Sequence, residues 1–332
     1  MPGLLNIGVI GLGVMGQRML ARLAAHARLR PLMVWDADPQ VLAQTVARHP
    51  HLRPATSADA LIRSSELRGI YIATPPQAHI PLTEAALDAG LAVLCEKPLS
   101  TDTDAARACI ARIERERRRA AVNFSLAASA GLSVLQQTFG IASRRPLGAL
   151  RSVELELSFA AWPRPWQADA GAWLSGRLEG GFTREVISHF IFVLQRVLGP
   201  AHLLRSTVRY PVDGLGAETA LDAELLAAGV PVRLRASVGG VPGAPADHNR
   251  MLWRASEGEI ELSEWFGRIV QRDGTQERVL GSPEQHHVSG TVDLLLHWMA
   301  MIEGHSHSLP GFAEALAVQQ TIEALLAGAD KE

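Results

Sequence analysis

Residues 181–190 of this chain read GFTREVISHF and place an acid and a histidine four positions apart in a largely apolar segment. Residues four apart on a helix share a face, so the side chains of Glu185 and His189 can point into one cleft. An unpaired buried charge is costly, so the acid needs a partner, a metal ion or a place in a reaction. An imidazole with a pKa of about 6.5 suits a base at neutral pH. From this segment alone, a core histidine with satisfied hydrogen bonds is the simpler interpretation.

The N-terminal segment contains a glycine pattern typical of nucleotide binding. A strand-like apolar run at residues 5–10 precedes GLGVMG at residues 11–16, and a helical stretch follows it. In such a loop the first glycine permits a tight turn, the second lets the backbone approach a pyrophosphate, and the third lets the helix pack on the strand. The N–H groups at the helix start then face the phosphates. We therefore predict that a dinucleotide binds at Gly11, Gly13, Val14, Met15 and Gly16. The alternative is a glycine-rich turn without a ligand.

An acid follows the second strand at the distance that this motif requires. Residues 31–35 are strand-like and end at Asp36, twenty residues after Gly16. A carboxylate there can accept hydrogen bonds from ribose hydroxyls and would repel a 2′-phosphate, and Ala37 supplies no compensating cation. We therefore expect NAD rather than NADP, unless another loop supplies an arginine.

The order of strands and helices predicts an α/β protein with two domains. Strand-like and helix-like segments alternate through residues 5–124, which predicts a doubly wound parallel Rossmann sheet covered on both faces. Residues 151–159, 202–210, 230–238 and 258–264 alternate apolar and polar positions without regular helices between them. This pattern predicts an open, mostly antiparallel sheet with one face free to meet a partner. We place a dinucleotide-binding domain at residues 1–122 and a substrate and oligomerisation domain at residues 123–332, with the last helix, 310–327, free to pack back on the first domain.

Composition excludes several classes of function. The net charge of -2 leaves no basic excess for nucleic acid or an anionic membrane. No apolar run reaches the ~18 residues of a membrane span, and the N-terminus lacks the basic region of a signal peptide. Two cysteines, Cys95 and Cys109, allow one disulfide, but two reduced thiols in a cytoplasmic protein are expected. His286, His287, His305 and His307 lie in polar stretches without cysteines or acids at ligand spacing, so no metal site is expected.

Several motifs are shared with one enzyme family. They are Thr74-Pro75-Pro76, then His79, then Glu96-Lys97-Pro98, with a further match at residues 180–189 and another at residues 309–326. With these motifs the chain resembles the Gfo/Idh/MocA oxidoreductases, named for glucose-fructose oxidoreductase and inositol dehydrogenase. The resemblance implies a Rossmann domain followed by a domain with an open sheet, whose face makes homodimers or homotetramers in the family. It also implies an NAD(P)-dependent oxidoreductase.

The resemblance also implies roles for individual residues. Lys97, Glu185 and His189 would converge on the nicotinamide, where His189 takes a proton from a secondary alcohol and Lys97 stabilises charge on its oxygen. Relatives usually carry Asp at the position of Glu185. The Glu185 carboxylate would orient the His189 ring or balance the positive charge of Lys97. Alternatively, Lys97 is a surface lysine, although it follows a parallel strand at the end where such sheets bind ligands. The cofactor-side residues would be Thr74, Pro75, Pro76, His79, Glu96 and Lys97, with His79 alternatively only opening its helix.

The substrate is the least defined part of the prediction. Residues 162–177 carry Trp162, Trp166 and Trp173, whose rings suit sugar surfaces, and two arginines that suit anionic groups. The alternative is that these tryptophans anchor the core or an interface. The predicted substrate-binding residues are Lys97, Asn123, Trp162, Trp173, Glu185 and His189. A SLAAS segment after Asn123-Phe124 stands where many relatives carry an arginine-aromatic pair, which predicts a less polar pocket floor. A sugar, a cyclic polyol or a related hydroxylated metabolite all fit.

Three functions are therefore open. The first is an NAD(P)-dependent dehydrogenase or reductase acting on a CH–OH group. The second is a nucleotide-sensing regulator that kept the Rossmann domain and lost catalysis. The third is a biosynthetic imine or enal reductase on the same scaffold.

Overall fold

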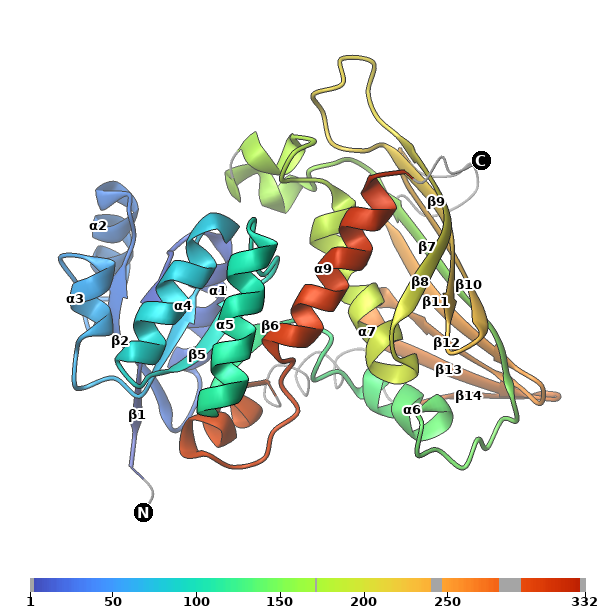
Figure 1. The fold of residues 1–332 in the computed structure, drawn as a ribbon, viewed down its shortest axis with the longest axis horizontal. Helices are drawn as coiled ribbons and strands as arrows, with labels where there is room; N and C mark the ends of the chain where they lie inside the picture. Colours follow the sequence, from blue (N-terminus) through green and yellow to red (C-terminus); the bar gives the residue numbers. More distant parts are fainter. Residues whose placement is uncertain (1–2, 171, 240–246, 281–293, 329–332) are drawn as a thin grey trace. The chain divides into compact units, whose positions relative to one another are not determined.

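The computed structural model describes residues 3–170, 172–239, 247–280 and 294–328 (Figure 1). The chain divides into two compact units, the first comprising Met1–Phe124 and Thr291–Leu316 and the second Ser125–Gly290 and Ala317–Glu332. This division differs from the predicted cut at 122/123, because a late segment of the chain returns to the first unit. Residues 294–303 are helical there, and the buried Trp298 ring lies 6.2 Å from the Tyr71 ring. The Val122 N–H also donates to the Pro310 carbonyl at 2.8 Å.

The first unit is built on a parallel sheet of six strands in the order β3-β2-β1-β4-β5-β6. This order is that of a dinucleotide-binding Rossmann fold and confirms the predicted class. The strands are β1 (Leu5–Ile10), β2 (Leu29–Trp35), β3 (Arg53–Pro54), β4 (Gly69–Ile72), β5 (Ala92–Glu96) and β6 (Ala120–Asn123). Strands β4 and β5 are buried throughout, as expected for a sheet covered on both faces.

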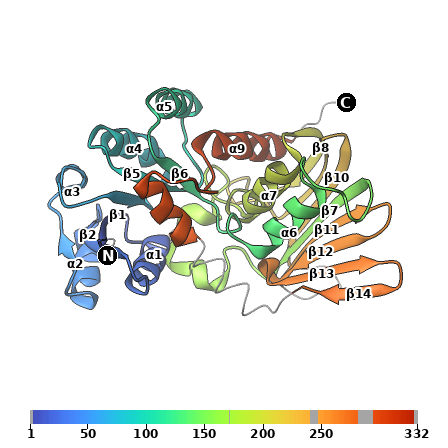
Figure 2. The same cartoon turned by 90° about the horizontal axis from the view of Figure 1, so that it is seen from below.

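Helices lie on both faces of this sheet, with α4 and α5 on one side and α1 on the other (Figure 2). The helices are α1 (Val14–Ala24), α2 (Pro39–Arg48), α3 (Ala58–Ile62), α4 (His79–Asp88) and α5 (Thr103–Glu116), with a 3-10 turn η1 (Pro76–Ala78) before α4. Three of them start at a residue whose side chain accepts backbone N–H groups of the first turn, namely Asp38, Ser57 and Asp102.

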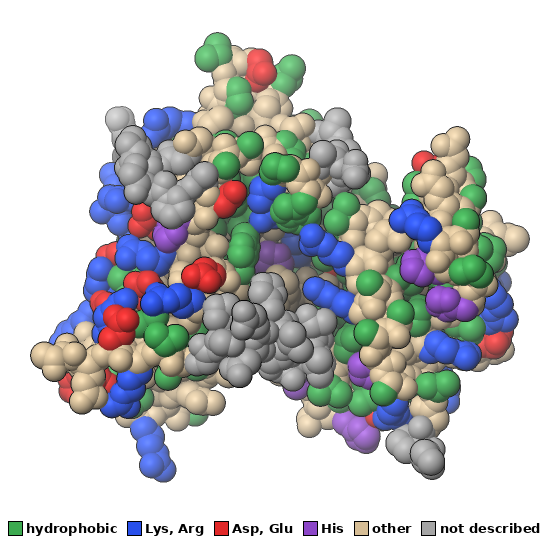
Figure 3. All heavy atoms as spheres, turned by 180° about the vertical axis from the view of Figure 1, so that it is seen from behind, with side chains coloured by type: hydrophobic (Ala, Val, Ile, Leu, Met, Phe, Trp, Pro, Cys, Tyr) green, Lys and Arg blue, Asp and Glu red, His purple; other side chains and the backbone are tan. Residues whose placement is uncertain are grey.

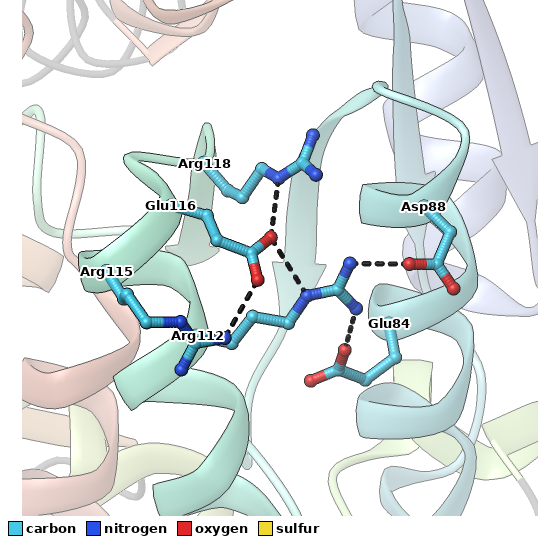
Figure 4. Close-up of polar contacts among 6 residues, drawn as sticks. All are labelled: Glu84, Asp88, Arg112, Arg115, Glu116 and Arg118. Atoms are coloured by element: carbon cyan, nitrogen blue, oxygen red, sulfur yellow. Dashed lines mark hydrogen bonds and ion pairs between the residues drawn. The ribbon is translucent and has the colours of Figure 1, made fainter.

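An ionic cluster joins α4 to α5 on the surface of the first unit (Figure 4). The Arg112 guanidinium contacts Glu84 and Asp88 of α4 and lies 3.1 Å from Glu116 on its own helix. Arg118 lies 3.0 Å from the same Glu116 carboxylate. These cations lower the pKa of Glu116 to about 2. Arg112, Arg115 and Arg118 are therefore all paired with acids on this helix face.

The second unit is built on an eight-stranded sheet in the order β14-β13-β12-β11-β7-β10-β9-β8. All neighbours are antiparallel except β7 and β10, which run parallel. The strands are β7 (Leu150–Phe159), β8 (Ala201–Arg209), β9 (Ala220–Ala227), β10 (Val230–Val238), β11 (His248–Ala255), β12 (Glu259–Ser263), β13 (Arg268–Asp273) and β14 (Gln276–Val279). The predicted open, mostly antiparallel sheet is confirmed.

Helices of the second unit cover one face of this sheet (Figures 1 and 2). They are α6 (Ala130–Phe139), α7 (Ser188–Leu198) and the later part of α9 (Phe312–Leu326), with short turns η2 (Pro165–Ala170), η3 (Ala172–Ser175), η4 (Thr183–Ile187) and η5 (Glu264–Phe266). The core on this face includes Trp253, whose ring stacks on Phe139 at 5.5 Å. Both cysteines are buried free thiols, as predicted. Among the described helices, none is long and apolar enough to span a bilayer.

Candidate active site

The glycine loop of the first unit has the conformation that its sequence predicts. Gly11 adopts a φ of 88°, and a Cβ there would lie 2.4 Å from the Ala73 carbonyl oxygen. A Cβ at Gly16 would lie 2.1 Å from the Gly11 carbonyl oxygen, so helix α1 packs against the loop only with glycine. Gly13 differs, because its φ of -66° suits any residue and a Cβ would meet nothing within 4 Å. The protein itself therefore does not require glycine at position 13, whereas a closely bound ligand would.

Asp36 anchors this loop. Its two carboxylate oxygens accept the Leu12 N–H at 2.7 Å and the Asp38 N–H at 2.9 Å. Each oxygen keeps a second lone pair, so the carboxylate can still accept hydrogen bonds from a ribose. Asp36 thus orients the turn at the start of α1 and also presents negative charge beside it.

His79 joins two loops at the carboxyl edge of the sheet. Its ring is 1% exposed, with Nε2 2.8 Å from the Thr74 carbonyl oxygen and Nδ1 2.9 Å from the Pro98 carbonyl oxygen. Burial lowers the pKa of His79, although both carbonyls oppose that shift. We expected His79 on the cofactor side, but the ring is enclosed between Thr74 and Pro98 and holds these loops in place. A buried Thr74 Oγ1 in the same loop has no hydrogen-bond partner among the described residues.

Glu96, the residue before Lys97, forms part of a buried polar cluster with residues of β4 and β6. Its Oε1 accepts hydrogen bonds from the Tyr71 hydroxyl and, at 2.7 Å, from Asn123 Nδ2. Burial, followed by the Glu96 charge, raises the pKa of Tyr71 well above its usual range. The buried Asn123 Oδ1 has no partner among the described residues, so it can accept a hydrogen bond from a ligand. Neither Tyr71 nor its contact with Glu96 was predicted, because 25 residues separate them in the chain.

Lys97 directly follows β5 and is half-buried at this edge. The chain contains two lysines, Lys97 and Lys331, and all its other basic side chains besides histidine are arginines. An ammonium can give up a proton when its surroundings demand it, whereas a guanidinium cannot. A lysine in a chain that otherwise uses arginine therefore indicates a function specific to the ammonium group. This indication was already present in the sequence.

The second unit carries Glu185 and His189 on one continuous helical segment. Glu185 lies in η4, a π-helical turn, and His189 lies in the first turn of α7. Such π turns occur frequently at functional sites, and the sequence did not predict this one. Both side chains are half-buried, and His189 Nδ1 lies 3.4 Å from Ser125 Oγ. Convergence of these residues with Lys97, which belongs to the other unit, stays a prediction.

Two charged side chains hold η4 in position. The Arg184 guanidinium pairs with Glu323 at 2.7 and 2.8 Å and donates to the Gly180 carbonyl at 3.0 Å. Glu218 is 1% exposed and accepts the Thr183 N–H at 2.6 Å, while its Oε2 has no partner among the described residues. Burial raises the pKa of Glu218. Arg184 thus ties η4 to the last helix, and Glu218 is a functional candidate that the sequence analysis missed.

The tryptophans differ in exposure. Trp162 is half-buried, donates from Nε1 to the Leu174 carbonyl at 3.1 Å and contacts the Phe159 ring at 5.5 Å. Trp173 is 39% exposed. The Arg164 guanidinium lies 4.6 Å from the ring centre of Trp166 and 5.2 Å from that of Trp265. Trp265 was not predicted, and it lies between two other residues with positive φ, Glu264 and Phe266.

No group of three potential metal ligands occurs within the described part of the chain. His286 and His287 lie outside it. His305 is highly exposed, and burial lowers the pKa of His307.

A comparison with known protein families gives a match for the first part of the chain. Residues 5–124 match the model of the Gfo/Idh/MocA oxidoreductase family, which is described by its NAD-binding Rossmann fold. The matched residues include all six strands of the parallel sheet of the first unit. This match agrees with the strand order and with the geometry of the glycine loop.

Sequence relatives of this domain are dehydrogenases. Inositol 2-dehydrogenase 4 of Saccharopolyspora erythraea is 32% identical over 124 residues, which is 36% of each chain. UDP-N-acetylglucosamine 3-dehydrogenase of Acidithiobacillus ferrooxidans is 35% identical over 106 residues, 32% of each chain. The chain therefore matches about a third of the length of these curated relatives.

Similarity of fold extends over the whole chain. An oxidoreductase from Agrobacterium radiobacter, solved with NAD+, L-tartaric acid and magnesium, superposes with a TM-score of 0.82 over 98% of this chain and 96% of that one, at 16% identity. The structure of the Acidithiobacillus ferrooxidans dehydrogenase superposes with a TM-score of 0.78 over 98% of both chains, at 18% identity. At these identities the likeness concerns the fold alone.

Proposed function

We propose that this protein is an NAD-dependent oxidoreductase that transfers a hydride between nicotinamide and a secondary alcohol or ketone. The substrate class is a sugar, a cyclic polyol or a related hydroxylated metabolite. The observation that carries the proposal is the arrangement at the carboxyl edge of the parallel sheet. The glycine loop, Asp36 and Lys97 follow β1, β2 and β5, and the carboxyl ends of parallel strands meet at one edge.

The residues present fit a dinucleotide. The open space at Gly13 and the unpaired N–H groups at the start of α1 suit a pyrophosphate, and Asp36 suits the ribose hydroxyls. Thr74 Oγ1 and Asn123 Oδ1 offer further unsatisfied polar atoms at the same edge. When bound, the nicotinamide accepts or supplies the hydride.

The proton is handled by the chain's own residues. To act as a base, His189 needs an unprotonated Nε2. The proton of the neutral imidazole then lies on Nδ1, and this N–H can donate a hydrogen bond to Ser125 Oγ. Lys97 hydrogen-bonds the reacting oxygen and stabilises its developing charge. Glu185, four residues before His189, orients the imidazole or balances the Lys97 ammonium. In the reverse direction the same groups protonate a ketone oxygen.

The cofactor preference follows from Asp36. Its carboxylate would face a 2′-phosphate, and Ala37 beside it is exposed and uncharged. We therefore propose NAD as the cofactor. The free thiols and the need for an intracellular nicotinamide pool favour the cytoplasm.

Fluorescence titration with NADH and NADPH tests the cofactor proposal. Asp36→Asn is a better control than Asp36→Ala, because the remaining carbonyl keeps one of the two loop hydrogen bonds. We expect tighter binding of NADH, with the preference reduced in Asp36→Asn. A preference for NADPH in the unaltered protein would contradict the argument from Asp36.

Substitution of Lys97 tests the catalytic proposal. In a screen of polyols and sugars with NAD, Lys97→Ala should lower kcat by roughly 100- to 1,000-fold while NADH affinity changes little. Lys97→Arg keeps the positive charge but replaces the compact ammonium with a larger planar guanidinium that cannot take the same position on the reacting oxygen, so it should restore little activity. Tight NADH binding without turnover of any substrate would favour a nucleotide-sensing regulator. Turnover of imines or enals alone would favour the biosynthetic reductase.

A further inference from the structure

An arginine of the second unit lies among three tryptophan rings. Arg164 Cζ is 4.6 Å from the ring centre of Trp166 and 5.2 Å from that of Trp265. It is 5.7 Å from the ring centre of Trp162, so all three distances lie within the ~6 Å of a cation–π contact. A buried amide fixes the direction of the guanidinium, because Gln167 Oε1 accepts its Nε–H at 3.0 Å. We call Arg164, Gln167 and these three tryptophans the Arg164 site.

Trp265 reaches this position through an unfavourable backbone conformation. Glu264, Trp265 and Phe266 have φ values of 52°, 57° and 64°, so three consecutive residues other than glycine lie in the left-handed region. Phe266 is buried in the core, whereas Trp265 is half-buried and donates its backbone N–H to Asn249 Oδ1 at 2.8 Å. Such residues are costly, and they gather at active sites and ligand clamps. The conformation of this turn therefore indicates a role for the Trp265 ring beyond packing.

The Arg164 site lies near the start of α7 and is accessible to a ligand. The Trp265 ring is 6.0 Å from the ring of Phe190, the residue that follows His189. Two short steps, 5.2 Å and 6.0 Å, thus separate the Arg164 cation from the neighbour of the candidate base. The Trp166 side chain is 46% exposed. On the second unit, below the β8–β9 hairpin that projects at the top of Figure 3, hydrophobic and basic side chains lie next to one another.

We propose that the Arg164 site binds an anionic group of the substrate, a carboxylate or a phosphate carried by a sugar or polyol. This inference rests on the proposed function, because it concerns the substrate of the same reaction. A guanidinium has five N–H donors, so it can hold such an anion in a planar fork while it keeps contacts within the protein. The Trp166 and Trp265 rings offer flat apolar faces to the C–H groups of a sugar ring. The substrate class is thereby narrowed to acidic or phosphorylated derivatives.

A purely structural role for Arg164 leads to a different expectation. If the guanidinium only held the three rings together, removal of its charge would weaken the binding of neutral and anionic ligands alike. A guanidinium that binds the substrate affects the anionic ligands far more than the neutral ones. Ligands that differ only in charge therefore separate the two roles.

Isothermal titration calorimetry of the full chain with matched ligands tests the proposal. D-glucuronate and D-glucose 6-phosphate carry an anionic group at the carbon where D-glucose has a hydroxyl, and D-galacturonate with D-galactose gives a second pair. We expect an anion to bind roughly 10- to 100-fold more tightly than its neutral counterpart, the range of a charge-assisted hydrogen bond. The anion that binds more tightly shows whether the site takes a carboxylate or a phosphate.

Substitution of Arg164 assigns the preference to this side chain. Arg164→Gln should lose most of the preference, while its affinity for the neutral sugar changes less than about threefold. Arg164→Lys keeps the charge without the planar fork, so it should retain only part of the preference. Arg177→Gln is the matched control, because Arg177 also lies over an aromatic ring, 3.9 Å from the ring centre of Tyr210, but outside the Arg164 site. This control should keep the full preference.

Thermal unfolding of each variant shows whether it remains folded. Equal affinity for anionic and neutral ligands in the unaltered protein, or no binding of any anion, would overturn the proposal. So would a preference that survives in Arg164→Gln, or an equal loss of affinity for both kinds of ligand. An NADH titration in the same buffer separates this inference from the proposed function. NADH binding without an anion preference contradicts only the Arg164 site, whereas an anion preference without NADH binding contradicts only the redox function.

Discussion

At the scale of single residues, Gly13 separates what the fold requires from what a ligand requires. Gly13→Ala should leave the free energy of unfolding within about 1 kcal/mol, because its φ of -66° and the surrounding space accept a Cβ. The same methyl group should weaken NADH binding at least about tenfold by obstructing the pyrophosphate. Thermal unfolding and NADH fluorescence titration measure the two effects.

Gly16→Ala provides the contrast. Its Cβ would lie 2.1 Å from the Gly11 carbonyl oxygen, so this variant should lose stability first and cofactor binding as a consequence. Equal NADH affinity in Gly13→Ala and the unaltered protein would mean that the pyrophosphate does not approach this position. Local spacing made the glycine loop and Asp36 predictable, because all the parts lie within 26 residues. The contact between Tyr71 and Glu96 was not predictable, because it depends on how two strands pair.

At the scale of elements, the π turn η4 depends on the buried carboxyl group of Glu218. Burial raises the pKa of this group above its unfolded value, so the folded protein holds the proton more tightly than the unfolded chain. The contribution of Glu218 to the free energy of unfolding is therefore fully present below its unfolded pKa of about 4.3. It is lost as the pH rises through its folded pKa. Glu218→Gln should remove this loss, since its carbonyl still accepts the Thr183 N–H and its amide resembles the protonated acid.

Thermal unfolding between pH 5 and pH 8 measures this effect. At neutral pH, Glu218→Gln should raise Tm by about 2–4 °C, and the difference from the unaltered protein should shrink toward pH 5. A Tm lowered equally at every pH would show instead that the charged form is required in the fold, with Arg184 as its partner. Alternating residues predicted the strands of this unit, but neither η4 nor the parallel pairing of β7 with β10 has a local sequence signal.

At the scale of the whole molecule, the two units share one chain that crosses between them more than once. The apolar segment around Trp298 belongs to the first unit although it follows the entire second sheet. The sequence predicted two domains, their sheets and a last helix, 310–327, that can pack back on the first domain, but it did not predict the return around Trp298, because an apolar helix does not indicate which core it joins. The family match ends at residue 124, so it does not cover the returning segment around Trp298 either.

The return segment leads to a prediction about how the molecule unfolds. Trp298 and Trp253 are both fully buried, but Trp298 lies beside Tyr71 in the first unit and Trp253 stacks on Phe139 in the second. Either change to alanine should cost about 3–5 kcal/mol. Trp298→Ala should lower the calorimetric transition that NADH raises, because the glycine loop belongs to the same unit. Trp253→Ala should leave that NADH-dependent transition in place and lower the other. If both variants shift the NADH-dependent transition equally, the two units unfold as one, and the separate cores do not confer separate stability.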